Sequence, residues 1–369
     1  MRALVLSSQY AETQHRGKLR ALAGLGVEIA AAIPNGSVGL DGGVRLLPIE
    51  ASGDAADPAS LRWRARVLKK TLAEFRPALV QIEEEPGTQG AAAAATACRK
   101  LRIPYVVFSW ESLPRRRGMM EARRWRATVS RAAGHIGGNR LAMGLLQGGS
   151  DAALATAMPQ GGLTPVEAPS REGPRAAVSI GFFGRLVPER GAEMLFRACA
   201  QLFGSWTLTI VGTGPEQEHL EDIAQRLGLA SRIRWIGGLP RAELEPLWNA
   251  LDVLVVPSQN TPTWTDRHSP VLLDAMMRGV APIVTPVGGL PETVGDAGVV
   301  VADVEALHLA LQEMVAEPGK CRALGARARQ RMLDLYLDSS IARRTLDFWL
   351  DLLAKPSAAI QAEIGPEPS

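Results

Sequence analysis

Two arginines follow the first apolar run in the second half of the chain, in the segment 181–191 (GFFGRLVPERG). Gly184 carries no side chain that would obstruct a ligand at the end of the predicted strand, and Pro188 favours the first position of a helix. Arg185 and Arg190 would then place two permanent cations beside the free N–H groups of a helix start, which is a site for a diphosphate. The alternative is that both arginines are solvated surface residues.

Two aspartates separated by seven residues lie in the segment 264–279 (WTDRHSPVLLDAMMRG). Ser269 can cap the helix that follows it. Asp266 would then lie in the loop before this helix and Asp274 in its second turn, so both carboxylates could bind sugar hydroxyls. The alternative is that both have structural roles: Asp266 stabilises the helix N-terminus through the helix dipole, and Asp274 pairs with Arg278.

A third turn, 211–215 (VGTGP), begins like the dinucleotide-binding fingerprint GxGxxG, but Gln217 occupies the third glycine position. The turn is therefore a weak signal for a nicotinamide cofactor. Gly212 would serve equally well in letting a ligand approach the backbone or in a plain strand-to-helix turn.

These turns follow short apolar runs that alternate with amphipathic stretches. The predicted strands are 3–7, 27–33, 79–82, 105–109, 135–138, 179–183, 206–211, 233–236, 253–256, 282–285 and 298–301. The predicted helices include 17–24, 61–75, 91–101 and 341–353. This alternation is typical of a doubly wound α/β sheet, whose ligands lie at the carboxyl ends of the strands.

Residues 150–175 interrupt the alternation with four prolines and three glycines, which suits a connection between domains. A length of 369 residues also fits two domains. We predict an N-terminal domain at 1–165, a second domain at 166–340, a C-terminal helix at 341–355 that packs back toward the first domain, and a disordered tail at 356–369.

The composition narrows the function by exclusion. With 41 basic and 38 acidic side chains, the chain is neither a polyanion-wrapping protein nor a charged disordered one. Its three cysteines lie far apart and its five histidines show no close pairing, so we predict no disulfide framework and no metal site, and a reducing cytoplasm is the default location. No apolar run is long enough to span a bilayer.

Residues 178–301 resemble the donor-binding domain of the retaining glycosyltransferases of family 4, which have the GT-B fold. That family binds the donor diphosphate through an arginine and a lysine, and these correspond to Arg185 and Arg190 here. Its motif WxExFGxxxxEAMxxG supplies two glutamates, whose places Asp266 and Asp274 take. The resemblance implies an α/β chain with two Rossmann-like doubly wound domains that face each other across a cleft.

Several residues depart from the family pattern. Both glutamates are replaced by the shorter aspartate, an arginine replaces the lysine, and Arg267, His268 and Ser269 replace the residues around Phe-Gly. The donor-binding residues that the resemblance implies are Gly184, Arg185, Arg190, Gly212, Asp266, Arg267, His268, Ser269 and Asp274. Arg185, Arg190 and Asp266 would act on the transfer itself, and Asp274 would hold the nucleotide ribose.

The first half of the chain is less typical of the family, because it lacks the glycine pair often found after the first strand. Acidic and aromatic residues follow two of its predicted strands, in 83–86 (EEEP) and 108–112 (FSWES). Similar loops occur in some family members, so Glu84, Glu85, Trp110 and Glu111 are candidates for acceptor binding. The alternative for the glutamates is a solvated charge run.

An arginine-rich segment lies in the same half. Its members are Arg115, Arg116, Arg117, Arg123, Arg124, Arg126 and Arg131, with Met119, Met120 and Trp125 between them. This composition predicts a helix that lies on an anionic membrane surface. The competing interpretation is a solvated basic helix.

The resemblance implies transfer of a hexose from a nucleoside diphosphate sugar to a glycan, lipid-linked or small-molecule acceptor, with retention of the anomeric configuration. No metal or other cofactor is expected, and no nucleic acid partner. Two alternatives are a non-catalytic glycosyltransferase-like partner protein and a GT-B nucleotide-sugar epimerase. The expected location is the cytoplasm, with peripheral contact at the inner face of the membrane.

Overall fold

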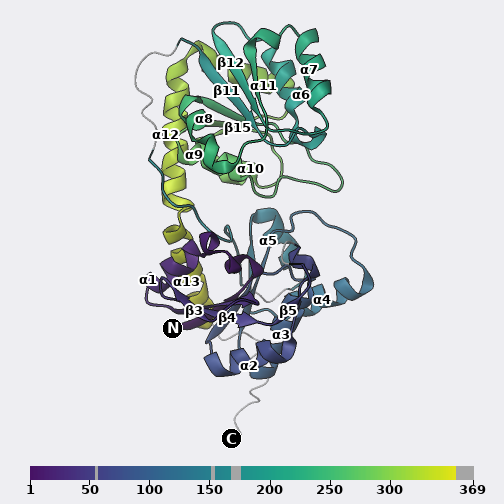
Figure 1. The fold of residues 1–369 in the computed structure, drawn as a ribbon, viewed down its shortest axis with the longest axis vertical. Helices are drawn as coiled ribbons and strands as arrows, with labels where there is room; N and C mark the ends of the chain where they lie inside the picture. The colour runs from purple at the N-terminus through teal and green to yellow at the C-terminus, as the bar shows by residue number, and fades with distance from the viewer. Residues whose placement is uncertain (55–56, 151–153, 168–175, 355–369) are drawn as a thin grey trace, which may run out of the picture. The chain divides into compact units, whose positions relative to one another are not determined.

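The computed structural model describes residues 1–54, 57–150, 154–167 and 176–354. The chain forms two compact units (Figure 1): the first combines Met1–Thr164 with the chain from Tyr336 onward, and the second is Pro165–Leu335. The predicted bounds put the second junction at residue 340, whereas the chain returns to the first unit at Tyr336. The predicted tail, 356–369, lies outside the described residues, and the cleft between the domains stays a prediction.

The N-terminal unit is built on an eight-stranded sheet of order β10-β9-β8-β7-β1-β2-β4-β3. All neighbours pair in parallel except β3 and β4. The strands are β1 (Arg2–Leu6), β2 (Glu28–Pro34), β3 (Gly39–Asp41), β4 (Val44–Ile49), β7 (Leu79–Ile82), β8 (Tyr105–Ser109), β9 (Gly134–Gly137) and β10 (Leu154–Ala157). Two short strands, β5 (Ala51–Ser52) and β6 (Arg62–Trp63), pair separately.

Helices cover both faces of this sheet and close two apolar cores. One core contains residues of α2 (Ala65–Phe75), α3 (Gln89–Leu101), α4 (Met119–Val129) and α5 (Arg140–Gln147). The other contains residues of α1 (Gly17–Gly24) and α13 (Asp338–Ala354). Phe348 and Trp349 of α13 are buried in this second core, so the C-terminal helix belongs to the N-terminal unit.

Three strands of this sheet were not predicted. β3 and β4 form a hairpin at one edge, and Pro48 within β4 is an unusual strand residue. β10 lies inside 150–175, which the sequence predicts to be a connection only. Its sequence, LATA, has few β-branched residues and therefore gives little signal for a strand. Helix α2 also begins later than predicted, at Ala65 rather than residue 61.

The C-terminal unit has a fully parallel six-stranded sheet of order β13-β12-β11-β14-β15-β16. Its strands are β11 (Val178–Phe183), β12 (Trp206–Val211), β13 (Ile233–Ile236), β14 (Val253–Val256), β15 (Ala281–Val284) and β16 (Val299–Val300). Its helices are α6 (Ala192–Cys199), α7 (Gln217–Arg226), α8 (Glu245–Ala250), α9 (Pro270–Met277), α10 (Leu290–Val294), α11 (Val304–Ala316) and α12 (Pro318–Leu335).

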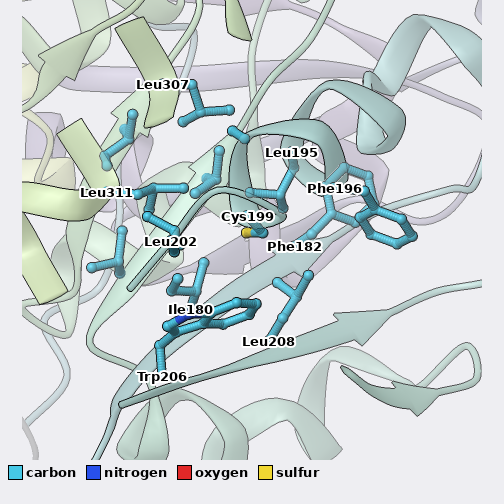
Figure 2. Packing of buried hydrophobic residues seen from close by; sticks show 14 of the residues in the cluster. Ile180, Phe182, Leu195, Phe196, Cys199, Leu202, Trp206, Leu208, Leu307 and Leu311 are labelled. Carbon is cyan, nitrogen blue, oxygen red and sulfur yellow. The ribbon is translucent and has the colours of Figure 1, made fainter. Parts of the chain in front are cut away.

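The core of this unit lies between the sheet and the helices α6, α7 and α11, with α12 also contributing. Figure 2 shows Ile180 of β11 and Trp206 of β12 packed near Leu195 of α6 and Leu311 of α11. Because β14 pairs directly with β11, the loops that follow these two strands emerge side by side at the same edge of the sheet. This adjacency positions the candidate site.

Candidate functional site

The turn after β11 places its two arginines differently from each other. Arg185 is exposed, and within the described part of the chain its guanidinium forms no hydrogen bond or ion pair. A 3-10 helix begins at Pro188, as predicted, but it spans only Pro188–Arg190, and the α-helix that follows begins at Ala192. Gly191 breaks the helical path because it has a φ of 70°.

Arg190 reaches across to the loop that follows β14. Its Nη1 donates to Oδ2 of Asp266 at 2.6 Å, and the Ser258 hydroxyl donates to the same oxygen at 2.9 Å. The Asp266 residue is only 2% exposed, whereas the Arg190 side chain is 31% exposed and lies over the Trp264 ring at 5.1 Å. A buried carboxylate thus holds a half-exposed cation in place at the strand ends.

Helix α9 begins where the sequence predicts, and its Asp274 lies close to an arginine of the same segment. The Ser269 hydroxyl accepts from the Leu272 N–H at 3.4 Å, which is the expected N-cap. Asp274 is buried in the second turn, and its Oδ1 lies 3.6 Å from Nη1 of Arg278, as in the structural alternative. Arg278 also pairs with Glu245 at 2.6 Å. Arg267 and His268 are exposed in the loop before the helix.

Gly184 and Gly212 differ in the space that a side chain would have at each position. A Cβ on Gly212 would lie 1.9 Å from the carbonyl oxygen of Gly184, and its φ of 135° is one that L side chains rarely adopt. A Cβ on Gly184 would meet no atom within 4 Å. The structure therefore gives Gly212 a packing role between two turns, while Gly184 borders open space.

A hollow of about 640 Å³ lies beside this cluster. Its wall includes Gly191 and Ala192 at the start of α6, Ser258 and Gln259 after β14, and Thr285 after β15. Ser258 is shared between the hollow and the Asp266 carboxylate. The edge of the sheet at which we expected a ligand thus carries both polar groups and space.

The acidic acceptor candidates that follow β7 are held by contacts within the N-terminal unit. Glu84 is buried, and its Oε1 accepts from the Ser8 N–H at 2.5 Å. Burial raises the pKa of Glu84 above its ordinary value, although the Ser8 hydrogen bond opposes this. Glu85 accepts from the Ser109 hydroxyl at 2.7 Å and from the Trp110 N–H at 2.8 Å. The solvated charge run is therefore the wrong interpretation of these glutamates.

Glu111 and Trp110 have separate partners. Glu111 is ion-paired with Arg115 at 2.5 Å and also with Arg117. Trp110 is half-buried and donates its indole N–H to Oε1 of Gln160 at 3.1 Å. The candidates thus end strands of one sheet, but each is held by its own contacts.

Glu83, a buried carboxylate that the sequence did not single out, lies at the centre of a polar cluster in this unit. Glu83 accepts from the Tyr10 hydroxyl at 2.5 Å, from the Gln160 amide at 3.1 Å, and from Lys18 and Gln81. Burial, reinforced by Glu83, raises the pKa of Tyr10 well above its ordinary value. The only sequence signal for this residue was its place directly after β7.

Gln81 links this cluster to the C-terminal helix, because the Trp349 indole N–H donates to its Oε1 at 2.7 Å. A continuous path of side-chain hydrogen bonds therefore runs from α13 through Gln81, Glu83 and Gln160 to Trp110.

Two kinds of feature are absent from the residues that the structure describes. No group of three or more His, Cys, Asp or Glu side chains is arranged to hold a metal ion. Within the same residues, no helix is both long and apolar enough to cross a membrane.

Two family models match the two halves of the chain. Residues 170–331 match the model of the group 1 glycosyl transferases, and residues 11–138 match that of the glycosyl transferase 4-like domain. The chain therefore belongs to the group 1 glycosyltransferases of family 4 and has their two-domain GT-B fold.

Curated relatives match over part of their length. A GDP-mannose-dependent α-(1-6)-phosphatidylinositol monomannoside mannosyltransferase of Mycolicibacterium smegmatis is 35% identical over 159 residues, which are 41% of this chain and 42% of that protein. A 2-deoxystreptamine glucosyltransferase of Streptomyces kanamyceticus is 31% identical over 42% of this chain and 36% of its own length. The chain thus spans less than half the length of these relatives.

Solved structures match the whole fold. A sucrose-phosphate synthase from Thermosynechococcus elongatus superposes with a TM-score of 0.67 at 20% identity, covering 96% of this chain and 99% of that one. Anabaena HepE, solved in complex with UDP, superposes with a TM-score of 0.66 at 18% identity, covering 95% and 100%. At these identities the likeness establishes the architecture alone.

Proposed function

We propose that this protein is a retaining glycosyltransferase that moves a hexose from a nucleoside diphosphate sugar to a glycan, lipid-linked or small-molecule acceptor. The observation that carries the proposal is the Arg190–Asp266–Ser258 cluster at the carboxyl ends of β11 and β14. Arg185 lies exposed on the same turn as Arg190. This arrangement offers two cations and a polar edge to a diphosphate.

The reaction breaks the bond between the anomeric carbon and the diphosphate oxygen and forms a bond from an acceptor oxygen to the same face of that carbon. Negative charge grows on the departing diphosphate, and Arg185 and Arg190 would stabilise it from fixed positions. The acceptor proton would pass to an oxygen of the departing diphosphate, so the step needs no side-chain nucleophile.

The aspartates have separate roles in this proposal. Asp266 keeps the Arg190 guanidinium oriented in the absence of donor and would share its carboxylate with a hydroxyl of the bound sugar. Asp274 would bind the nucleotide ribose, which requires its contact with Arg278 to give way. No step in this scheme needs a metal.

The relatives support the substrate classes. The Mycolicibacterium smegmatis relative is named for GDP-mannose and a phosphatidylinositol monomannoside, and the Streptomyces kanamyceticus relative is named a glucosyltransferase. HepE was solved with UDP. GDP-mannose is a hexose activated by a nucleoside diphosphate, and UDP is a nucleoside diphosphate that a donor of this kind would release. In the N-terminal unit, Glu84, Glu85, Trp110 and Glu111 stay our candidates for the acceptor side, with the reaction in the cytoplasm.

The test is incubation with a panel of nucleoside diphosphate sugars, with release of the nucleoside diphosphate as the readout. Arg190→Ala should slow release by about 10² to 10³-fold, the range seen when one preorganised donor to a developing charge is removed. Arg226→Ala is the control, because Arg226 ends α7 and pairs only at the surface with Asp222 at 2.7 Å; it should leave the rate unchanged.

Other outcomes separate the alternatives. Release that Arg190→Ala does not slow would remove the diphosphate assignment. Failure to bind any nucleoside diphosphate sugar would instead favour a non-catalytic partner protein. Conversion of the donor to a second nucleotide sugar without release of diphosphate would favour an epimerase.

A further inference from the structure

The seven arginines of 115–131 are not equivalent in the structure. Arg115 and Arg117 are ion-paired with Glu111, and Arg115 also pairs with Glu121. Arg124 donates from Nε to the carbonyl oxygen of Gly87 at 2.8 Å. These three side chains therefore serve contacts within the N-terminal unit.

The remaining four have no such contacts. Arg116, Arg123, Arg126 and Arg131 are exposed, and none of their guanidinium groups forms an ion pair or hydrogen bond with another described residue. Their charge is thus available to a partner.

Helix α4 presents these cations along one side. Its Thr128 and Val129 are buried, and Trp125 packs against the apolar core beneath. Positions 119, 120, 123, 126, 127 and 130 follow the three-and-four spacing of a single helix face, and all of them are exposed. This face begins with Met119 and Met120, which are 72% and 68% exposed, and continues with Arg123 and Arg126.

An arginine from the neighbouring helix completes this face. Arg99 of α3 is held beside α4 by bonds from its guanidinium to the Ala127 carbonyl at 2.7 Å and to the Thr96 hydroxyl at 3.0 Å. Arg99, Arg123, Arg126 and Arg131 line an open hollow of about 360 Å³, together with Ala127 and Ser130. No carboxylate is among these lining residues, so the hollow is suited to an anion.

We propose that this side of α4, with Arg99, is a docking surface for a bilayer containing anionic phospholipids. Met119 and Met120 would enter the boundary of the acyl chains, and the arginine-lined hollow would receive lipid phosphate groups. A soluble phosphate ligand would account for the arginines but not for two methionines exposed on the same face. The inference goes beyond the proposed transfer reaction and does not depend on it.

The test is cosedimentation of the full chain with phosphatidylcholine vesicles, with and without phosphatidylglycerol, at low salt. Binding should require phosphatidylglycerol and weaken as salt is raised. Each arginine near an anionic surface strengthens binding roughly fivefold, so the triple variant Arg123→Gln, Arg126→Gln, Arg131→Gln should bind about one hundredfold more weakly.

A matched control removes the same number of charges elsewhere. Arg322 and Arg327 of α12 and Arg343 of α13 are exposed, and the triple variant with glutamine at these positions should bind vesicles like the parent chain. An equal loss in this control would show that net charge, and not the α4 surface, drives binding. Thermal unfolding of each variant would show that the fold is retained.

A second variant distinguishes the two sources of phosphate. Met119→Ser with Met120→Ser should weaken vesicle binding about tenfold or more, because it removes apolar area that enters the lipid. The same variant should leave unchanged any binding of soluble glycerol phosphate. Vesicle binding that is insensitive to the methionines would overturn the membrane proposal in favour of a soluble anion.

Discussion

Each of the two units has a buried carboxylate in the loop that follows one of its strands, but the two carboxylates have opposite roles. In the C-terminal unit, Asp266 has two side-chain partners, and one of them, Arg190, keeps 31% of its side chain exposed. In the N-terminal unit, Glu83 is enclosed by Tyr10, Lys18, Gln81 and Gln160. The first carboxylate orients a cation toward solvent, whereas the second joins several segments of its unit.

This contrast separates a ligand site from a structural cluster even though both are buried and charged. A cation that is half-exposed can meet a phosphate without a change in the fold. A lysine and a carboxylate that are both buried cannot, because reaching a ligand would break a pair whose members have no access to water. The contrast predicts that substitutions at Glu83 act on stability and those at Arg190 act on turnover.

The largest expected effect is on stability, from Glu83→Ala. It leaves the Lys18 ammonium, 1% exposed, without its partner and should lower the free energy of unfolding by about 3–5 kcal/mol. Denaturant unfolding measures this. Asp266→Ala leaves a half-exposed arginine that water can reach, so its cost should be smaller. An equal loss of unfolding free energy in the two variants would contradict the distinction between the enclosed Glu83 cluster and the solvent-accessible Asp266 cluster.

A second variant keeps the Glu83 prediction specific to the ion pair. Replacing both members, with Lys18→Met and Glu83→Leu, removes the unpaired charge and should recover part of the stability lost in Glu83→Ala. If the double variant is as unstable as the single one, the loss comes from packing and not from the buried charge.

A smaller pair of effects concerns the glycines near the candidate donor site. Gly212→Ala places a Cβ against the Gly184 carbonyl and should destabilise the chain by about 1–3 kcal/mol. Gly184→Ala should leave unfolding nearly unchanged, since its Cβ would meet nothing within 4 Å, but should weaken donor use if the diphosphate lies there. Unfolding midpoints and nucleoside diphosphate release measure the two properties separately.

The reverse pattern would be informative. A neutral Gly212→Ala would mean that the two turns can separate. A Gly184→Ala variant with full donor turnover would move the diphosphate away from this strand end.

The sequence predicted most strand ends, but it did not predict the long-range side-chain pairs of the two units. Runs such as 206–211 and 253–256 are continuous and rich in β-branched residues, so their strands coincide with the structure. Ser269 likewise caps α9 through a local contact. The Arg190–Asp266 pair joins residues 76 positions apart, and the Lys18–Glu83 pair joins residues 65 apart. Such contacts depend on strand order, which local spacing does not encode.

The smallest expected effect comes from the raised pKa of Glu84, the buried residue that follows Glu83. Burial raises this pKa above its ordinary value of 4.5, so the folded chain keeps a proton that the unfolded chain has already lost. The free energy of unfolding should therefore fall as pH rises from 4.5 through the raised pKa, and stay level above it. Glu84→Gln cannot titrate and keeps an oxygen to accept from the Ser8 N–H, so its fall over this window should be smaller. Glu74→Gln, at an exposed residue of α2, is the control and should keep the parent's pH dependence. Urea unfolding at a series of pH values gives all three curves. Parallel curves for the parent and Glu84→Gln would mean that Glu84 is solvated, like the exposed arginine of the Asp266 cluster and unlike the enclosed Glu83.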